Sequence, residues 1–168
     1  MTVLTDGVLT LRPPAEADVE ALYVAAQDPE IPRWTSVPSP YTREHAREFV
    51  GRSDPRVRSF LGFVDDELAG SFSLLELDLE TGYGEIGYWV SAPARGRGVA
   101  SRAVTLLRDY GVRELGLNRI ELIIHTGNQA SLRVGERTGF LDTGERRSAP
   151  RVDPPTPPEF AVYAWSPE

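Results

Sequence analysis

The spacing of hydrophobic residues predicts a chain in which strands and helices alternate. Short apolar runs predict strands over residues 8–12, 59–64, 68–77, 83–91, 119–125, 140–147 and 160–165. Apolar residues at helical spacing predict helices over 15–26, from a cap at Thr42 to about residue 50, over 99 to about 110, and from a cap at Asn128 to Gly139. Residues 28–40 hold four prolines, which predicts irregular structure there.

The order of these elements predicts a fold of the α/β (α+β) class with one mixed sheet. Strands and helices alternate in the second half, which favours parallel pairing, whereas residues 65–67 are expected to turn an antiparallel hairpin. We expect a six- to seven-stranded central sheet flanked by about four helices. The chain has no internal repeats, and we expect residues 1–168 to form a single domain.

Composition narrows the chemistry that the chain can perform. The absence of cysteine excludes a thiolate nucleophile and thiolate–zinc sites, and two histidines far apart in sequence argue against a metal site. A net charge of −7 argues against nucleic-acid binding; it suits a cationic acceptor such as an amine, although it can equally serve solubility. No run is apolar enough to span a membrane and no signal peptide is apparent, so we expect a cytoplasmic protein.

A glycine-rich turn between a strand and a helix is the most informative segment. It runs from Arg95 to Ala100, and the first N–H groups of the helix behind it have no partner within the helix. With the helix dipole they favour an anion, Gly96 and Gly98 allow close approach of phosphate oxygens, and Arg95 and Arg97 add charged donors. A plain strand-to-helix turn is the alternative. The glycine spacing fits neither a Rossmann turn nor a P-loop.

Two motifs resemble those of the GNAT superfamily of N-acyltransferases. Arg95-x-x-Gly98-x-Ala100 after a strand resembles its pyrophosphate-binding motif. Asn128-Gln129-Ala130-Ser131, followed by Val134 and Gly139-Phe140, resembles the second motif of its RimJ/RimL-type branch, which includes ribosomal-protein N-terminal acetyltransferases and many small-molecule enzymes.

The resemblance implies where an acetyl-CoA donor binds. The strands over Tyr83–Ser91 and Arg119–His125 should splay apart so that the pantetheine arm pairs with backbone groups of Trp89 and Val90. The pyrophosphate should lie on the turn formed by Arg95, Gly96, Arg97, Gly98, Val99 and Ala100. Asn128 and Ser131 should contact the cofactor arm, although both are also suited to capping the helix that follows.

The resemblance also implies acetyl transfer to a primary amine by direct attack in a ternary complex. An alkyl ammonium, with a pKa of about 10, must lose a proton first, and we expect Glu85 to accept it; the alternative is a structural carboxylate. Ser131 is the candidate for protonating the thiolate or contacting the sulfur; the alternative is a first-turn serine that bonds its own backbone. Many relatives use a tyrosine where this chain has Gly135, and some use a glutamate where it has Pro150, so those roles do not transfer. Close approach of the cofactor or another backbone would explain Gly135 inside a helix.

The acceptor pocket and partners are the least defined part. Trp34, Tyr41, Tyr88 and the loop over residues 150–158 are candidates for holding the amine, with core packing as the alternative for Trp34 and Tyr88. The partners expected are acetyl-CoA and an amine, either a small molecule or a protein N-terminus, and the resemblance allows a homodimer. No metal, nucleic acid or membrane is implied. The alternatives are a non-catalytic acyl-CoA-binding module and, less favoured, a protein that binds another nucleotide.

Overall fold

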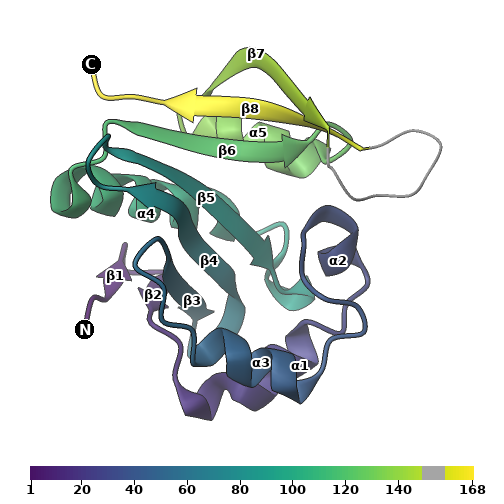
Figure 1. Ribbon diagram of the computed structural model, residues 1–168. Helices are drawn as coiled ribbons and strands as arrows, with labels where there is room; N and C mark the ends of the chain where they lie inside the picture. Colours follow the sequence, from purple (N-terminus) through teal and green to yellow (C-terminus); the bar gives the residue numbers. More distant parts are fainter. Residues whose placement is uncertain (149–157) are drawn as a thin grey trace.

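The strands form one mixed, eight-stranded sheet in the computed structural model, which describes residues 1–148 and 158–168 (Figure 1). Their order across the sheet is β1-β2-β3-β4-β5-β6-β8-β7, and all neighbours are antiparallel except β5 and β6. The strands are β1 (Leu4–Thr5), β2 (Thr10–Arg12), β3 (Arg58–Val64), β4 (Glu67–Asp78), β5 (Tyr83–Val90), β6 (Arg119–His125), β7 (Leu141–Ser148) and β8 (Glu159–Trp165). The expectation of six to seven strands is corrected, because the two residues of β1 fold back onto β2 and add an edge strand.

Five α-helices accompany the sheet in the part of the chain that the structure describes, instead of about four. They are α1 (Val19–Ala25), α2 (Glu30–Trp34), α3 (Arg43–Val50), α4 (Val99–Leu115) and α5 (Gln129–Arg137), with 3₁₀ turns η1 (Glu16–Asp18) and η2 (Ala92–Ala94). The unexpected helix is α2, in the segment read as irregular. Pro32 is its third residue, where a helix has no use for an N–H, so proline is tolerated.

The boundaries of α3 and α4 follow from their caps. Thr42 Oγ1 accepts the main-chain N–H of His45 at 3.2 Å and begins α3, as the sequence predicts. Helix α4 continues past Tyr110 to Leu115, because Val112 and Leu115 still pack against the core. Gly116 then ends it in the left-handed conformation, with φ of 70°.

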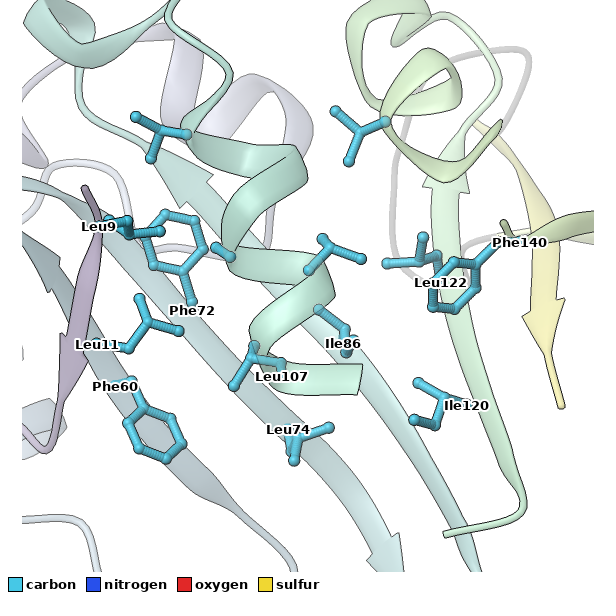
Figure 2. Packing of buried hydrophobic residues seen from close by; sticks show 14 of the residues in the cluster. Leu9, Leu11, Phe60, Phe72, Leu74, Ile86, Leu107, Ile120, Leu122 and Phe140 are labelled. Carbon is cyan, nitrogen blue, oxygen red and sulfur yellow. The ribbon is translucent and has the colours of Figure 1, made fainter. Parts of the chain in front are cut away.

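The helices lie on both faces of the sheet and enclose two hydrophobic clusters. Helices α4 and α5 cover one face, where the larger cluster joins residues of β2 to β6, α4 and the start of β7 (Figure 2). Helices α1 and α3 cover the other face of β3 to β5, where a smaller cluster includes Leu22, Ala46 and Leu61. Within the described residues, no helix is both long and apolar enough to span a bilayer.

The feature that positions the candidate site is the divergence of β5 and β6. The two strands pair only at three positions, Tyr83–Glu85 with Arg119–Glu121. Beyond Glu85, β5 keeps its pairing with β4 and β6 keeps its pairing with β8, so the two strands move apart towards their carboxyl ends (Figure 1). The splay expected from the resemblance is therefore confirmed.

Candidate active site

The turn between β5 and α4 presents a row of main-chain N–H groups that have no partner. Residues 95–98 are exposed, and Gly96 and Gly98 have φ of 73° and 75°, in the region that favours glycine. In the described parts of the chain, 1–148 and 158–168, the N–H groups from Gly96 to Ser101 donate to no other group. No side chain caps the helix at Gly98. This arrangement can bind an anion such as a diphosphate.

Arg95 is engaged by the protein itself. Its Nη1 donates to Asp28 Oδ2 at 2.7 Å, and its Nε donates to the main-chain oxygen of Val90 at 3.1 Å. The hydrogen bond from the Glu30 N–H, followed by the Arg95 contact, lowers the pKa of Asp28. The side chain of Arg95 therefore joins the turn to the segment before α2, whereas Arg97 is exposed.

The register of β4 and β5 decides which main-chain groups of β5 face the divergence. The main-chain N–H of Ser91 donates to the main-chain oxygen of Ala69 in β4. Main-chain groups of alternate residues point to the same side of a strand. Trp89, paired with Ser71, accordingly turns its N–H and C=O towards β4. Those of Tyr88 and Val90 face the side on which β6 departs. Of the two residues expected to offer main-chain groups, Val90 therefore faces the divergence and Trp89 faces β4.

Ser131 and Tyr88 face each other from the two sides of the divergence. Asn128 Oδ1 accepts the main-chain N–H of Ser131 at 3.3 Å, which caps α5 and orients its first turn. Tyr88 Oη lies 2.7 Å from Ser131 Oγ, and either oxygen can be the donor. Burial raises the pKa of Tyr88, and the bond to Ser131 offsets this only in part. A pair of hydroxyls therefore joins β5 to the first turn of α5 across the divergence.

Glu85 belongs to a second polar group, on the opposite face of β5. It stands directly across from Glu121 of β6 in the register, at the last paired position. Tyr83 Oη lies 2.8 Å from Glu85 Oε1 and 2.8 Å from Glu121 Oε2. Burial and these two carboxylates raise the pKa of Tyr83, so the phenol stays protonated.

The two carboxylates differ in their other partners. Glu121 is 3% exposed and pairs with Arg119 at 2.8 Å and Arg147 at 3.6 Å. Glu121 therefore has two arginine partners in addition to the Tyr83 hydroxyl. For Glu85 the Tyr83 hydroxyl is the side-chain partner, within the described part of the chain. Of the two, Glu85 is therefore the carboxyl group that no arginine engages within the described residues.

The candidates for the acceptor pocket lie in three different surroundings. Trp34 packs edge-on against His125 at 5.0 Å between ring centroids. Tyr41 packs with α1 and α3, and burial raises its pKa. Tyr88 is paired with Ser131. The structure does not bring these three side chains together, and residues 150–157 of the fourth candidate lie outside the described residues.

A side chain of the protein accounts for the absence of a Cβ atom at Gly135. A Cβ atom at this position would lie 2.9 Å from Cδ2 of Tyr163 and 3.6 Å from Cδ1 of Ile124. A larger residue at this position would require the ring of Tyr163 to shift. Pro150, the other position where a relative's catalytic residue is absent, lies outside the described residues.

Sequence reasoning missed three functional contacts. Tyr83 could have been noticed because it shares a strand face with Glu85, two residues away. Glu121 could have been noticed because it is a lone carboxylate in the apolar run of β6. The Asp28–Arg95 pair left no sequence signal, since 67 residues separate the partners.

In the described ranges no group of three or more His, Asp or Glu residues could hold a metal ion.

Comparison with known proteins identifies the family. A family model described as "Acetyltransferase (GNAT) domain" matches residues 8–141. The N-acetyltransferase p20 of Bacillus licheniformis, which is uncharacterized, is 31% identical over 152 residues, covering 86% of this chain and 85% of that protein. The chain belongs to the GNAT acetyltransferase family.

Other members of the GNAT family are similar over different lengths. YdaF of Bacillus subtilis, provisionally named a ribosomal N-acetyltransferase, is 40% identical over 83 residues. That match covers 49% of this chain and 45% of YdaF, so the chain spans about half the length of that relative. A solved structure of RimL, a ribosomal L7/L12 alpha-N-protein acetyltransferase in complex with coenzyme A, superposes with a TM-score of 0.88 at 20% identity and covers 98% of both chains. At this identity the likeness establishes the GNAT fold alone.

Proposed function

We propose that this protein is an N-acetyltransferase that transfers the acetyl group of acetyl-CoA to a primary amine. The observation that carries the proposal is the divergence of β5 and β6 next to the unpaired N–H groups that begin α4. A diphosphate on these N–H groups would let the rest of the cofactor enter between the strands. Membership of the GNAT family and the name of the p20 relative support the same activity.

The proposed binding site divides the cofactor among three parts of the chain. The main-chain groups from Gly96 to Ala100, with Arg97, bind the diphosphate, since Asp28 already neutralises Arg95. Val90 and Tyr88 offer main-chain groups to the pantetheine arm. Asn128 and Ser131, at the start of α5, lie beside the thioester end.

The proposed reaction is a direct attack in a ternary complex. Glu85 accepts a proton from the substrate ammonium, and the amine nitrogen then attacks the thioester carbonyl. The C–S bond breaks as the amide forms, and Ser131 donates a proton to the departing thiolate. Placing two reactants in one cleft supplies much of the rate enhancement.

The acceptor is proposed only as a class. A protein N-terminus, as in the names of RimL and YdaF, or a small amine would each enter as a cation, and the net charge of −7 favours its approach. A single domain over 1–168, a cytoplasmic location and a homodimer remain predictions from the sequence.

The test is a charge reversal at the proposed diphosphate site. Gly98→Glu introduces a carboxylate among the unpaired N–H groups and should abolish binding of acetyl-CoA, measured by calorimetry and by thermal shift. Gly144→Glu is the matched control, because Gly144 also has a left-handed φ, 81°, and open space around it, but lies on β7. Unimpaired binding by the Gly98 variant would refute the diphosphate site.

Activity is tested by thiol release from acetyl-CoA across a panel of peptides, polyamines and other amines. Release with at least one amine is the expected result. Binding of acetyl-CoA without release with any amine would favour the alternative, a non-catalytic acyl-CoA-binding module on the same fold.

A further inference from the structure

The hydroxyl pair of Tyr88 and Ser131 connects the two sides of the divergence. Tyr88 comes from β5 beyond the last position paired with β6, and Ser131 comes from the first turn of α5. The 2.7 Å between their oxygens corresponds to a well-formed O–H···O hydrogen bond. Within residues 1–148 and 158–168, neither hydroxyl has another hydrogen-bond partner.

A count of the protons gives this bond a direction. Each hydroxyl carries one proton, and a phenol is a far stronger acid than an aliphatic alcohol, so the favoured arrangement has Tyr88 donating to Ser131. Ser131 then accepts through one lone pair while its own O–H is free to point elsewhere. Asn128 fixes the first turn of α5 through the main-chain N–H of Ser131 and leaves the hydroxyl unused.

Serine alone is poorly matched to the proton transfer that the proposed function requires. A thiol has a pKa of about 8.5, so its thiolate is too weak a base to take a proton from an isolated alcohol. A phenol has an ordinary pKa of about 10, and although burial raises the pKa of Tyr88, it is still a stronger acid than an aliphatic alcohol and can supply the proton if it is connected to the sulfur. Tyr88 cannot replace Ser131 directly, because its hydroxyl is already committed to the serine.

The surroundings of Tyr88 fix the position of its ring and keep its hydroxyl protonated. The ring stacks on Phe72 of β4, with 6.1 Å between centroids and 21° between planes, and packs against the larger hydrophobic cluster. Burial raises the pKa of the phenol, and among the described residues no charged side chain shifts it. The hydroxyl is therefore protonated at neutral pH and aimed at a single acceptor.

We propose that Tyr88 is a positioning residue that supplies, through Ser131, the proton taken up by the departing thiolate. The inference rests on the proposed acetyl transfer and deepens it. As the C–S bond breaks, the electron pair stays on sulfur, the Ser131 proton moves to sulfur, and the Tyr88 proton moves to Ser131 Oγ. The products are the free thiol, an intact serine and a tyrosinate, which regains its proton from solvent before the next turnover.

The test removes one oxygen atom at a time. Tyr88→Phe keeps the ring and its stacking, and Ser131→Ala removes the serine hydroxyl. Tyr110→Phe is the matched control, because Tyr110 is another partly buried tyrosine of the same core but lies on α4, in contact with Phe60. Thiol release at saturating acetyl-CoA gives kcat, calorimetry gives the Kd of acetyl-CoA, and both are measured from about pH 6.5 to pH 9.5, a range that spans the thiol pKa.

The relay predicts one pattern of results. Tyr88→Phe and Ser131→Ala should each lower kcat about 10- to 100-fold, and the double variant should be no slower than the slower single variant, because the two hydroxyls act as a unit. The Kd of acetyl-CoA should stay within about twofold of the parent. The deficit of Tyr88→Phe should shrink above about pH 8.5, where the thiolate leaves without a proton. Tyr110→Phe should match the parent.

Three results would overturn the relay. They are an unchanged kcat in Tyr88→Phe, a deficit that does not vary with pH, and losses that multiply in the double variant. Each leaves the proposed function intact as long as the parent releases thiol. If the parent binds acetyl-CoA and releases no thiol with any amine, the proposed function fails, and the relay fails with it.

Discussion

Glu85 and Tyr88 lie three residues apart on β5 and point to opposite faces of the sheet. Glu85 joins Tyr83 and Glu121 at the last position where β5 and β6 pair, whereas Tyr88 packs on Phe72 and meets Ser131 on the side covered by α4 and α5. In the proposed reaction, the amine therefore loses its proton on one side of the strand and the thiolate gains one on the other.

Removal of the Glu85 charge should slow the reaction without affecting the cofactor. Glu85→Gln keeps an oxygen that can accept from Tyr83, but it cannot take a proton, so kcat should fall about 100-fold near pH 7. The loss should diminish as pH rises through about 10, the pKa of an alkyl ammonium, because a growing share of the amine is then neutral. Glu44→Gln, which alters an exposed carboxylate on α3 that pairs with Arg47, is the control. A Glu85→Gln enzyme with parental kcat would assign Glu85 a structural role.

The Asp28–Arg95 pair should oppose cofactor binding. Asp28→Asn leaves Arg95 free to pair with a phosphate and removes a negative charge beside the turn, so acetyl-CoA should bind about 3- to 10-fold more tightly at low salt. Calorimetry at low and high salt tests this, and the gain should decrease with salt. Asp142→Asn breaks a comparable pair with Arg146 far from the turn and should change nothing. Weaker binding by Asp28→Asn would mean that the pair is needed to shape the turn.

Gly135→Ala should destabilise the fold even though alanine is the better helix former. The new methyl group would lie 2.9 Å from the Tyr163 ring, and overpacking of this kind costs about 1–3 kcal/mol, more than the roughly 1 kcal/mol that alanine gains in a helix. Urea unfolding measures the change. Tyr163→Leu should recover part of it in the double variant. Stabilisation by Gly135→Ala alone would show that the ring can move aside at little cost.

The Arg12–Asp18 pair should make stability depend on pH below about 4. Arg12 donates to both oxygens of Asp18 at 2.8 Å, and this contact lowers the pKa of the Asp18 carboxyl below its ordinary 3.8. Because the folded pKa is the lower one, the contribution is complete above pH 3.8 and is lost as pH falls through the folded pKa.

Asp18→Asn measures that contribution. It should lower the free energy of unfolding by about 2–3 kcal/mol at pH 7, because it leaves Arg12 without its charged partner. The gap to the parent should close as pH falls below the ordinary aspartate pKa. A gap that persists unchanged at acid pH would exclude the ion pair as its source. Glu20→Gln, whose partner Arg43 is exposed, should have little effect at either pH.

The elements that sequence predicted best are those with strong local signals. The hairpin between β3 and β4 was placed by its acidic turn, where Asp65 and Asp66 adopt φ of 51° and 63°, as a tight turn of this kind requires. The helix caps at Thr42 and Asn128 and the alternating apolar residues of β6 could likewise be predicted from the local sequence. The short helix α2 was missed because proline usually signals a break, and only its position within the helix makes it harmless.

The candidate site was predicted in part, for a physical reason. The glycine turn and the Asn128–Ser131 motif are contiguous in sequence, so their chemistry could be inferred without a structure. The contacts between Tyr88 and Ser131, and between Tyr83 and Glu121, join residues 43 and 38 positions apart. They depend on register and on strand faces, which hydrophobic periodicity predicts only as an alternation and not as a pairing.

The pairing on the outer sides of β5 and β6 has an energetic consequence. Since β5 pairs with β4 and β6 pairs with β8 beyond the point of divergence, β5 and β6 pair with each other at only three positions within the described residues. The separation is already present before any ligand arrives. An incoming acyl donor would therefore break no β5–β6 hydrogen bonds, and none of its interaction energy would be spent on separating the two strands.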